Sequence, residues 1–286
     1  MSVPASPPVP PAEMPPARTV LIPDRGELFL RDTGGDGPVV MLLHGWMASA
    51  DLNWWAVYGA LRGAGYRVLA IDHRGHGRGL RALTDFRLID CADDAAAALR
   101  ALDLAPALVV GYSMGGAIAQ LLARDHGDTV HGLVLSATAQ HWQDPRTRRA
   151  FKSMGALGTT LSLAPRASWK AGLRRAGIPP GEHTSWVQSE LMRHSARDLA
   201  EAGRELGRFD SRPWLHSISA PVAVVLTTRD ELVPPRKQQA LAEAANAQVF
   251  EAPIKHLEIG WLAGEYNPAL LKALEAVSGR VAAKAA

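Results

Sequence analysis

Apolar residues gather in short runs along this chain, and most runs have the length of a β-strand. Seven segments rich in β-branched and aliphatic residues fit strands, at 27–32, 39–43, 67–72, 107–110, 132–136, 221–226 and 247–251. Between several of them lie Ala-rich stretches of helical length, such as 89–102 and 116–123. Strands that alternate with helices predict an α/β fold with a mainly parallel sheet covered on both faces.

The alternation stops once, between residues 141 and 214. No convincing strand falls there, but helical stretches occur, with Gly and Pro between them. The segment holds four tryptophans, Trp142, Trp169, Trp186 and Trp214. It also holds 13 Lys and Arg against seven Asp and Glu, in a chain whose net charge is only +3. This local excess either attracts an anionic substrate or an acidic lipid surface, or forms ordinary solvated helix faces.

These breaks divide the chain into three parts. We predict a core formed by residues 18–140 and 215–286, with a helical insertion at 141–214. Seven prolines lie between Pro4 and Pro16, which predicts a disordered, polyproline-like tail over residues 1–17.

Composition limits the classes of protein to which the chain can belong. With 286 residues, 47% of them hydrophobic, it can bury one large core. A single cysteine excludes a disulfide framework, and the apolar runs are too short for an integral membrane segment. The N-terminus has neither the basic nor the apolar region of a signal peptide, so we expect a cytoplasmic protein. The basic residues do not form a nucleic-acid-binding module, so we expect no nucleic-acid partner.

The most informative motif is the G-x-S-x-G pentapeptide, Gly111-Tyr112-Ser113-Met114-Gly115. It follows an apolar strand and precedes an apolar helix, which is the context in which this motif forms a sharp turn with an exposed serine. A serine nucleophile needs a histidine to accept its proton and a carboxylate to orient that histidine. The motif therefore predicts Ser113 as a catalytic nucleophile.

The remaining catalytic groups are expected downstream, in the order acid and then histidine. Asp230 follows the strand at 221–226, and His256 follows the last strand. His256 is the only one of the ten histidines downstream of Asp230. We therefore predict Asp230 as the acid, with Glu231 as its neighbouring rival, and His256 as the base.

A third element would stabilise a negatively charged oxygen. The strand at 39–43 ends in His44-Gly45-Trp46, where glycine lets the loop fold back toward the nucleophile. The backbone N–H groups of Trp46 and Met114 are the candidate oxyanion donors.

In this combination of motifs, the chain resembles members of the α/β-hydrolase superfamily over about residues 18–280. The resemblance rests on the His44–Trp46 loop, the Asp72-His73-Arg74-Gly75-His76-Gly77 loop, the serine elbow, and the late Asp230 and His256. The motifs are similar to those of small bacterial serine esterases, lactonases and haloperoxidase-like perhydrolases. The resemblance implies that the insertion forms a helical cap over the active site.

Together these features predict a serine hydrolase that cleaves a small or medium ester or lactone through an acyl-enzyme intermediate. We expect no metal and no organic cofactor, because a single cysteine and the lack of an H-E-x-x-H motif argue against a metal site. The same triad could serve a thioesterase, a C–C hydrolase or a perhydrolase, and a low-turnover ligand receptor could retain the fold. The sequence leaves the oligomeric state open.

Overall fold

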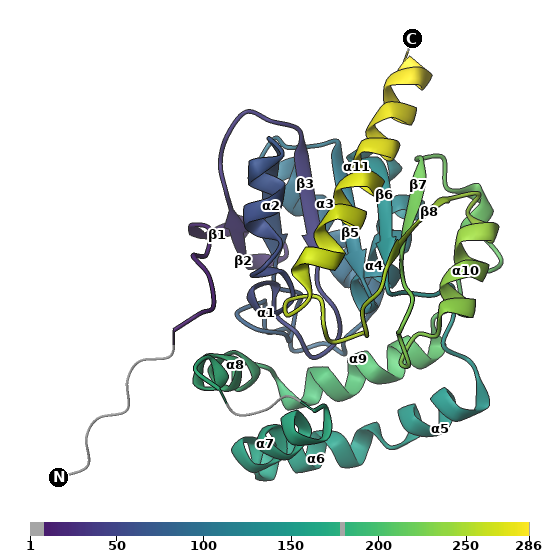
Figure 1. The fold of residues 1–286 in the computed structure, drawn as a ribbon. Coiled ribbons are helices and arrows are strands. Elements are labelled where there is room, and N and C mark those ends of the chain that lie inside the picture. Colours follow the sequence, from purple (N-terminus) through teal and green to yellow (C-terminus); the bar gives the residue numbers. More distant parts are fainter. Residues whose placement is uncertain (1–8, 178–180, 286) are drawn as a thin grey trace.

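An eight-stranded sheet forms the centre of the computed structural model, which describes residues 9–177 and 181–285 (Figure 1). The strands are β1 (Ala17–Ile22), β2 (Gly26–Asp32), β3 (Val39–Leu43), β4 (Arg67–Ile71), β5 (Ala107–Tyr112), β6 (Val130–Ser136), β7 (Val222–Thr227) and β8 (Gln248–Ala252). Their order across the sheet is β1-β2-β4-β3-β5-β6-β7-β8. From β4 to β8 in this order, neighbouring strands pair in parallel. β2 pairs antiparallel with both of its neighbours, β1 and β4. The predicted mainly parallel α/β sheet is confirmed.

Helices lie on both faces of this sheet and beyond one of its ends. They are α1 (Ala50–Trp54), α2 (Tyr58–Gly63), α3 (Leu88–Ala101), α4 (Met114–Asp125), α5 (Pro145–Lys152), α6 (Met154–Leu163), α7 (Pro165–Arg175), α8 (Thr184–Leu191), α9 (Ala196–Arg208), α10 (Pro235–Ala244) and α11 (Ala263–Ala285). One buried cluster joins the sheet to α3, α4 and α10, and a second joins the opposite face to α1, α2 and α11 (Figure 1).

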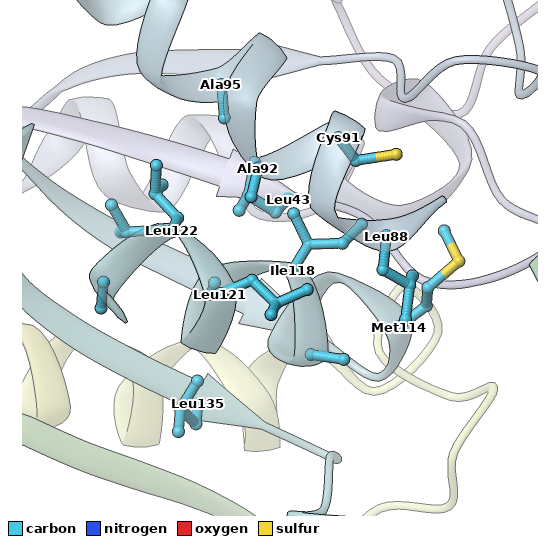
Figure 2. Close-up of a cluster of buried hydrophobic side chains, with 14 of the residues drawn as sticks. Leu43, Leu88, Cys91, Ala92, Ala95, Met114, Ile118, Leu121, Leu122 and Leu135 are labelled. Atoms are coloured by element: carbon cyan, nitrogen blue, oxygen red, sulfur yellow. The ribbon is translucent and has the colours of Figure 1, made fainter. Parts of the chain in front are cut away.

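The alternation of side chains along β3 shows how the two layers form. Met41 and Leu43 belong to the cluster with α3 and α4, whereas Val40 and Leu42 belong to the other. Figure 2 shows Ile118 of α4 among the residues that pack between the sheet and α3. Cys91 lies in the same region, fully buried, and burial raises the pKa of its thiol well above the ordinary value. The layered core thereby fixes the strand ends that carry the site.

The N-terminal segment differs from the predicted tail where the structure describes it. Ala17, assigned to the tail, is the first residue of β1, which pairs antiparallel with β2. The carbonyl of Pro15 accepts a hydrogen bond from the Arg31 guanidinium at 2.9 Å, and that of Pro16 accepts one from the Asp32 N–H at 3.1 Å. The end of the predicted tail is therefore held against β2 by these two hydrogen bonds and leads directly into the sheet. Residues 1–8 of the predicted tail lie outside the described part of the chain.

Five helices, α5 to α9, lie between β6 and β7 in the chain and gather at one end of the sheet (Figure 1). Buried ion pairs attach them to the core. Glu190 of α8 accepts hydrogen bonds from Arg78 at 2.6 and 3.0 Å and from Ser49 at 3.1 Å. Within residues 9–177 and 181–285, no helix has the length and apolar character needed to cross a membrane.

Candidate active site

Ser113 occupies the turn between β5 and α4 with a backbone conformation that L-residues rarely adopt. Its φ is 53° and its ψ is −114°. Such a backbone conformation costs on the order of 1–3 kcal/mol of strain energy. A Cβ on Gly111 would collide with the Gly115 carbonyl, and one on Gly115 would collide with the Leu43 carbonyl. Glycine is therefore required on both sides of the serine, as the motif predicts.

Hydrogen bonds hold this turn in place. The N–H of Ser113 donates to the Ser136 carbonyl at 2.9 Å, and the hydroxyl of Thr138 donates to the Ser113 carbonyl at 2.7 Å. Both partners come from β6 or the residues just after it, so the neighbouring strand fixes the position of the serine.

The structure brings Ser113, His256 and Asp230 into one hydrogen-bonded line. His256 Nε2 lies 3.0 Å from Ser113 Oγ, and its Nδ1 lies 2.6 Å from Asp230 Oδ2. The His256 side chain is 11% exposed, and the Asp230 side chain is fully buried. These are the distances at which a base can take a proton from a hydroxyl while a carboxylate orients its ring.

Asp230 is fixed by hydrogen bonds to both carboxylate oxygens. Oδ1 accepts the N–H groups of Leu232 and Val233, each at 2.8 Å, and Oδ2 also accepts the Thr227 hydroxyl at 2.9 Å. The rival Glu231 has a side chain that is 83% exposed, with Lys255 at 4.0 Å. Only Asp230 therefore lies in position to orient His256.

Several residues that the sequence analysis did not single out hold these groups in place. The buried amide of Gln238 accepts the Thr227 N–H at 3.0 Å and donates to the Thr227 hydroxyl at 2.8 Å, which supports the strand end before Asp230. The Tyr112 hydroxyl donates to the His256 carbonyl at 2.6 Å. A fully buried glutamine is unusual, but its burial cannot be recognised in the sequence, so no sequence signal pointed to Gln238.

The loop after β3 lies against the serine. A Cβ on Gly45 would be 3.4 Å from Ser113 Cβ, and the Gly45 N–H donates to Asn53 Oδ1 at 2.8 Å. Met114 opens α4, so its N–H belongs to the first turn, where a helix supplies no internal acceptor. The indole of Trp46 donates to the Leu199 carbonyl of α9 at 2.9 Å. Met114 directly follows Ser113, and Trp46 directly follows Gly45, which lies against Ser113. The two predicted oxyanion donors therefore belong to segments beside the serine.

His44 anchors the same loop as a neutral ring. Its Nδ1 donates to the Gly45 carbonyl at 2.8 Å, and its Nε2 accepts the His73 N–H at 2.9 Å. Burial lowers the pKa of His44 well below its ordinary value. The rings of His73 and His76 lie 4.3 and 5.5 Å from that of His44, and burial likewise lowers their pKa values, that of His73 to about 3. These rings therefore add no positive charge beside the site.

An apolar cavity of about 390 Å³ opens onto Ser113 and His256. None of the 22 residues that line it is Asp, Glu, Lys or Arg. A larger hollow of about 780 Å³ lies elsewhere and is lined by none of the five predicted site residues. Within the described ranges, no group of three or more His, Cys, Asp or Glu is arranged to hold a metal ion. An uncharged molecule with a reactive carbonyl is the ligand that the chemistry of this cavity fits best.

Comparison with known proteins agrees with this architecture. A family model described as the alpha/beta hydrolase fold matches residues 38–168. The pimeloyl-[acyl-carrier protein] methyl ester esterase of Chromobacterium violaceum is 31% identical over 230 residues, which span 78% of this chain and 88% of that protein. The bifunctional esterase/perhydrolase of Acinetobacter calcoaceticus is 38% identical over 114 residues, 39% of this chain and 41% of that one. The crystal structure of a bromoperoxidase from Bacillus anthracis superposes with a TM-score of 0.77 at 22% identity, covering 91% of this chain and all of the other.

Proposed function

The chain belongs to the α/β-hydrolase family, and we propose that it is a serine hydrolase that cleaves a carboxylic ester or lactone. The observation that carries the proposal is the continuous line from Ser113 Oγ through His256 to Asp230, with distances of 3.0 and 2.6 Å. The relative with the longer match is named as a methyl ester esterase, which supports an ester as the substrate class.

In the proposed reaction, Ser113 Oγ attacks the ester carbonyl while His256 Nε2 accepts the hydroxyl proton. The backbone N–H groups of Trp46 and Met114 stabilise the oxyanion that forms. His256 then gives its proton to the leaving alkoxide, which departs as an alcohol. Asp230 keeps the imidazole in the productive tautomer throughout. Water, activated by His256, attacks the acyl-enzyme and releases the carboxylic acid.

We further propose that residues 141–214 act as a cap on a catalytic core formed by residues 18–140 and 215–286. Two contacts support this division of labour. The Trp46 indole binds the Leu199 carbonyl of α9, and Arg78 pairs with Glu190 of α8. The reacting groups come from loops of the sheet, whereas α7 and α8 contribute walls of the cavity.

Covalent labelling with a fluorophosphonate tests the nucleophile. The wild-type protein should be labelled on Ser113, and Ser113→Ala should not be labelled, with turnover of esters falling on the order of 10⁴-fold to 10⁶-fold. Ser162→Ala is a matched control, because Ser162 is an exposed serine of α6. Labelling that survives in Ser113→Ala would contradict the assignment.

A further inference from the structure

One face of α7 is apolar but is only partly covered by the protein. Trp169, Gly172, Leu173 and Ala176 follow the spacing i, i+3, i+4 and i+7, which places them on one side of the helix. All four line the cavity beside Ser113. No residue of α7 is fully buried, and Trp169 and Leu173 are only partly covered by the cluster on α8. A helix with such a face gains burial only when something apolar fills the cavity.

The charged residues of α7 do not reach this face. They are Arg166, Lys170, Arg174 and Arg175; all four are exposed, and none of them lines the cavity. The cavity therefore remains free of charge although the helix is basic. A carboxylate or ammonium placed inside it would lose its hydration without gaining a partner.

Indole rings dominate the remaining wall. Five of the chain's eight tryptophans line this one cavity, namely Trp46, Trp55, Trp169, Trp186 and Trp261. The rings of Trp55 and Trp261 lie 5.6 Å apart and are inclined by 58°, an arrangement that offers both a face and an edge. Aromatic rings bind each other in offset or edge-on contact, so these walls suit a flat aromatic group better than a flexible chain.

Gly172 leaves the space that such a group would need. A Cβ built on Gly172 meets no atom within 4 Å, so a larger side chain there would extend into open space. Alanine is a better helix former than glycine at an interior position, so glycine at position 172 does not serve helix stability. The cavity volume of about 390 Å³ lies within the range of roughly 300–1,000 Å³ that is typical of sites for small organic ligands.

We propose that this cavity selects an uncharged ester with an aromatic acyl group, and that Gly172 sets the depth available to that group. The inference rests on the proposed ester hydrolysis by Ser113, and it adds the substrate class. It assigns Gly172 a role in specificity rather than in the chemistry.

A series of methyl esters tests the preference, because the alcohol stays constant. Methyl 3-phenylpropanoate and methyl nonanoate have acyl groups of equal carbon number, and monomethyl octanedioate places a carboxylate at the far end. We expect kcat/KM for the aromatic ester to exceed that for the linear ester by about tenfold and that for the charged ester by about 100-fold. Equal values for the three esters, or a preference for the linear or charged one, would overturn the proposal.

Gly172→Phe tests the depth of the cavity. We expect this change to lower kcat/KM for methyl 3-phenylpropanoate by about tenfold more than for methyl acetate. Gly279→Phe is the matched control, since Gly279 is an exposed helix glycine of α11 with the same open space around its Cβ. The ratio of the two esters should not change in that control. An unchanged ratio in Gly172→Phe would refute the role of this position.

A binding measurement separates this inference from the proposed function. Ser113→Ala should bind 3-phenylpropanamide with a saturable change in tryptophan fluorescence, and it should bind nonanamide about tenfold more weakly. If the wild-type protein hydrolyses esters without an aromatic preference, the substrate class is wrong and the hydrolase stands. If the amide binds as expected but no ester is cleaved, the cavity assignment stands and the hydrolase proposal fails.

Discussion

Acidification from about pH 7.5 to about pH 5.5 is expected to lower the free energy of unfolding by at least about 3 kcal/mol, because three histidines are fully buried as neutral rings. His44, His73 and His76 are at most 2% exposed. Burial lowers all three pKa values, to about 3 for His73 and well below the ordinary value of 6.5 for the other two. The unfolded chain therefore binds protons below pH 6.5 that the folded chain does not, and stability falls as the pH falls.

The size of the effect follows from proton linkage. With an unfolded pKa of 6.5 and a folded pKa well below it, each histidine contributes a loss of about 1.4 kcal/mol at about pH 5.5, or about 4 kcal/mol for the three. Asp72 acts in the opposite direction, because burial raises the pKa of its carboxyl from 3.8 to about 6. Its proton uptake in the folded state returns about 0.8 kcal/mol. The three histidines outweigh Asp72, and a net loss of about 3 kcal/mol remains. His194, whose pKa burial also lowers to about 3, adds to the loss in the same direction.

Urea unfolding followed by tryptophan fluorescence at the two pH values measures this difference. His73→Phe is the informative variant, because neither ring nitrogen of His73 has a hydrogen-bond partner in the described structure. It should lose about 1.4 kcal/mol less than the wild-type protein on acidification. His216→Asn, at an exposed position, should behave like wild type. Equal stability of the wild-type protein at both pH values, or a full loss in His73→Phe, would refute the reasoning.

Two further substitutions probe the acid and the attachment of the cap. Asp230→Asn should lower kcat on a methyl ester on the order of 10⁴-fold in a pH-stat assay, whereas Glu231→Gln should change it by less than about twofold; the reverse order would place the acid one residue later. Glu190→Gln should lower the free energy of unfolding in urea by about 2 kcal/mol, because Arg78 loses its nearest buried carboxylate and keeps the more distant Asp51, at 3.3 Å. Glu205→Gln, which breaks an exposed pair, should lower it by less than about 1 kcal/mol, and equal losses would count against a buried cap attachment.

The strands that could be predicted from the sequence are those with a strongly apolar pattern. All seven predicted strands are present, each within two residues of its predicted bounds. The strand that was missed, β1 (Ala17–Ile22), is largely exposed and lies at the edge of the sheet. It is held by pairing with β2 more than by burial, and its apolar run is only three residues long, from Val20 to Ile22. Pro15 and Pro16 directly precede this strand, and prolines in a sequence indicate a segment outside a sheet.

The sequence predicts the site residues whose type is limited by the chemistry, and it does not reveal the residues that support them through packing. Ser113, Asp230 and His256 were identified because acyl transfer accepts few side chains in few orders, and the structure brings all three together. Their catalytic roles stay proposals that labelling and turnover must test. Gln238 was missed because its contact with Thr227 exists only after α10 packs on β7. No spacing rule links two residues that meet through tertiary structure.

The basic surplus of residues 141–214 left two uses open, attraction of an anion or a solvated surface. The structure favours neither simple alternative, because several of these charges pair with carboxylates. Arg193 contacts Glu190 at 3.0 Å, and Arg197 contacts Asp85 of the core at 2.8 Å. The cavity beside Ser113 meanwhile contains no charged side chain in its lining. The paired charges thus include contacts between residues 141–214 and the rest of the chain, whereas Ser113 and His256 border an apolar cavity. Electrostatic interactions are stronger in apolar surroundings than in water.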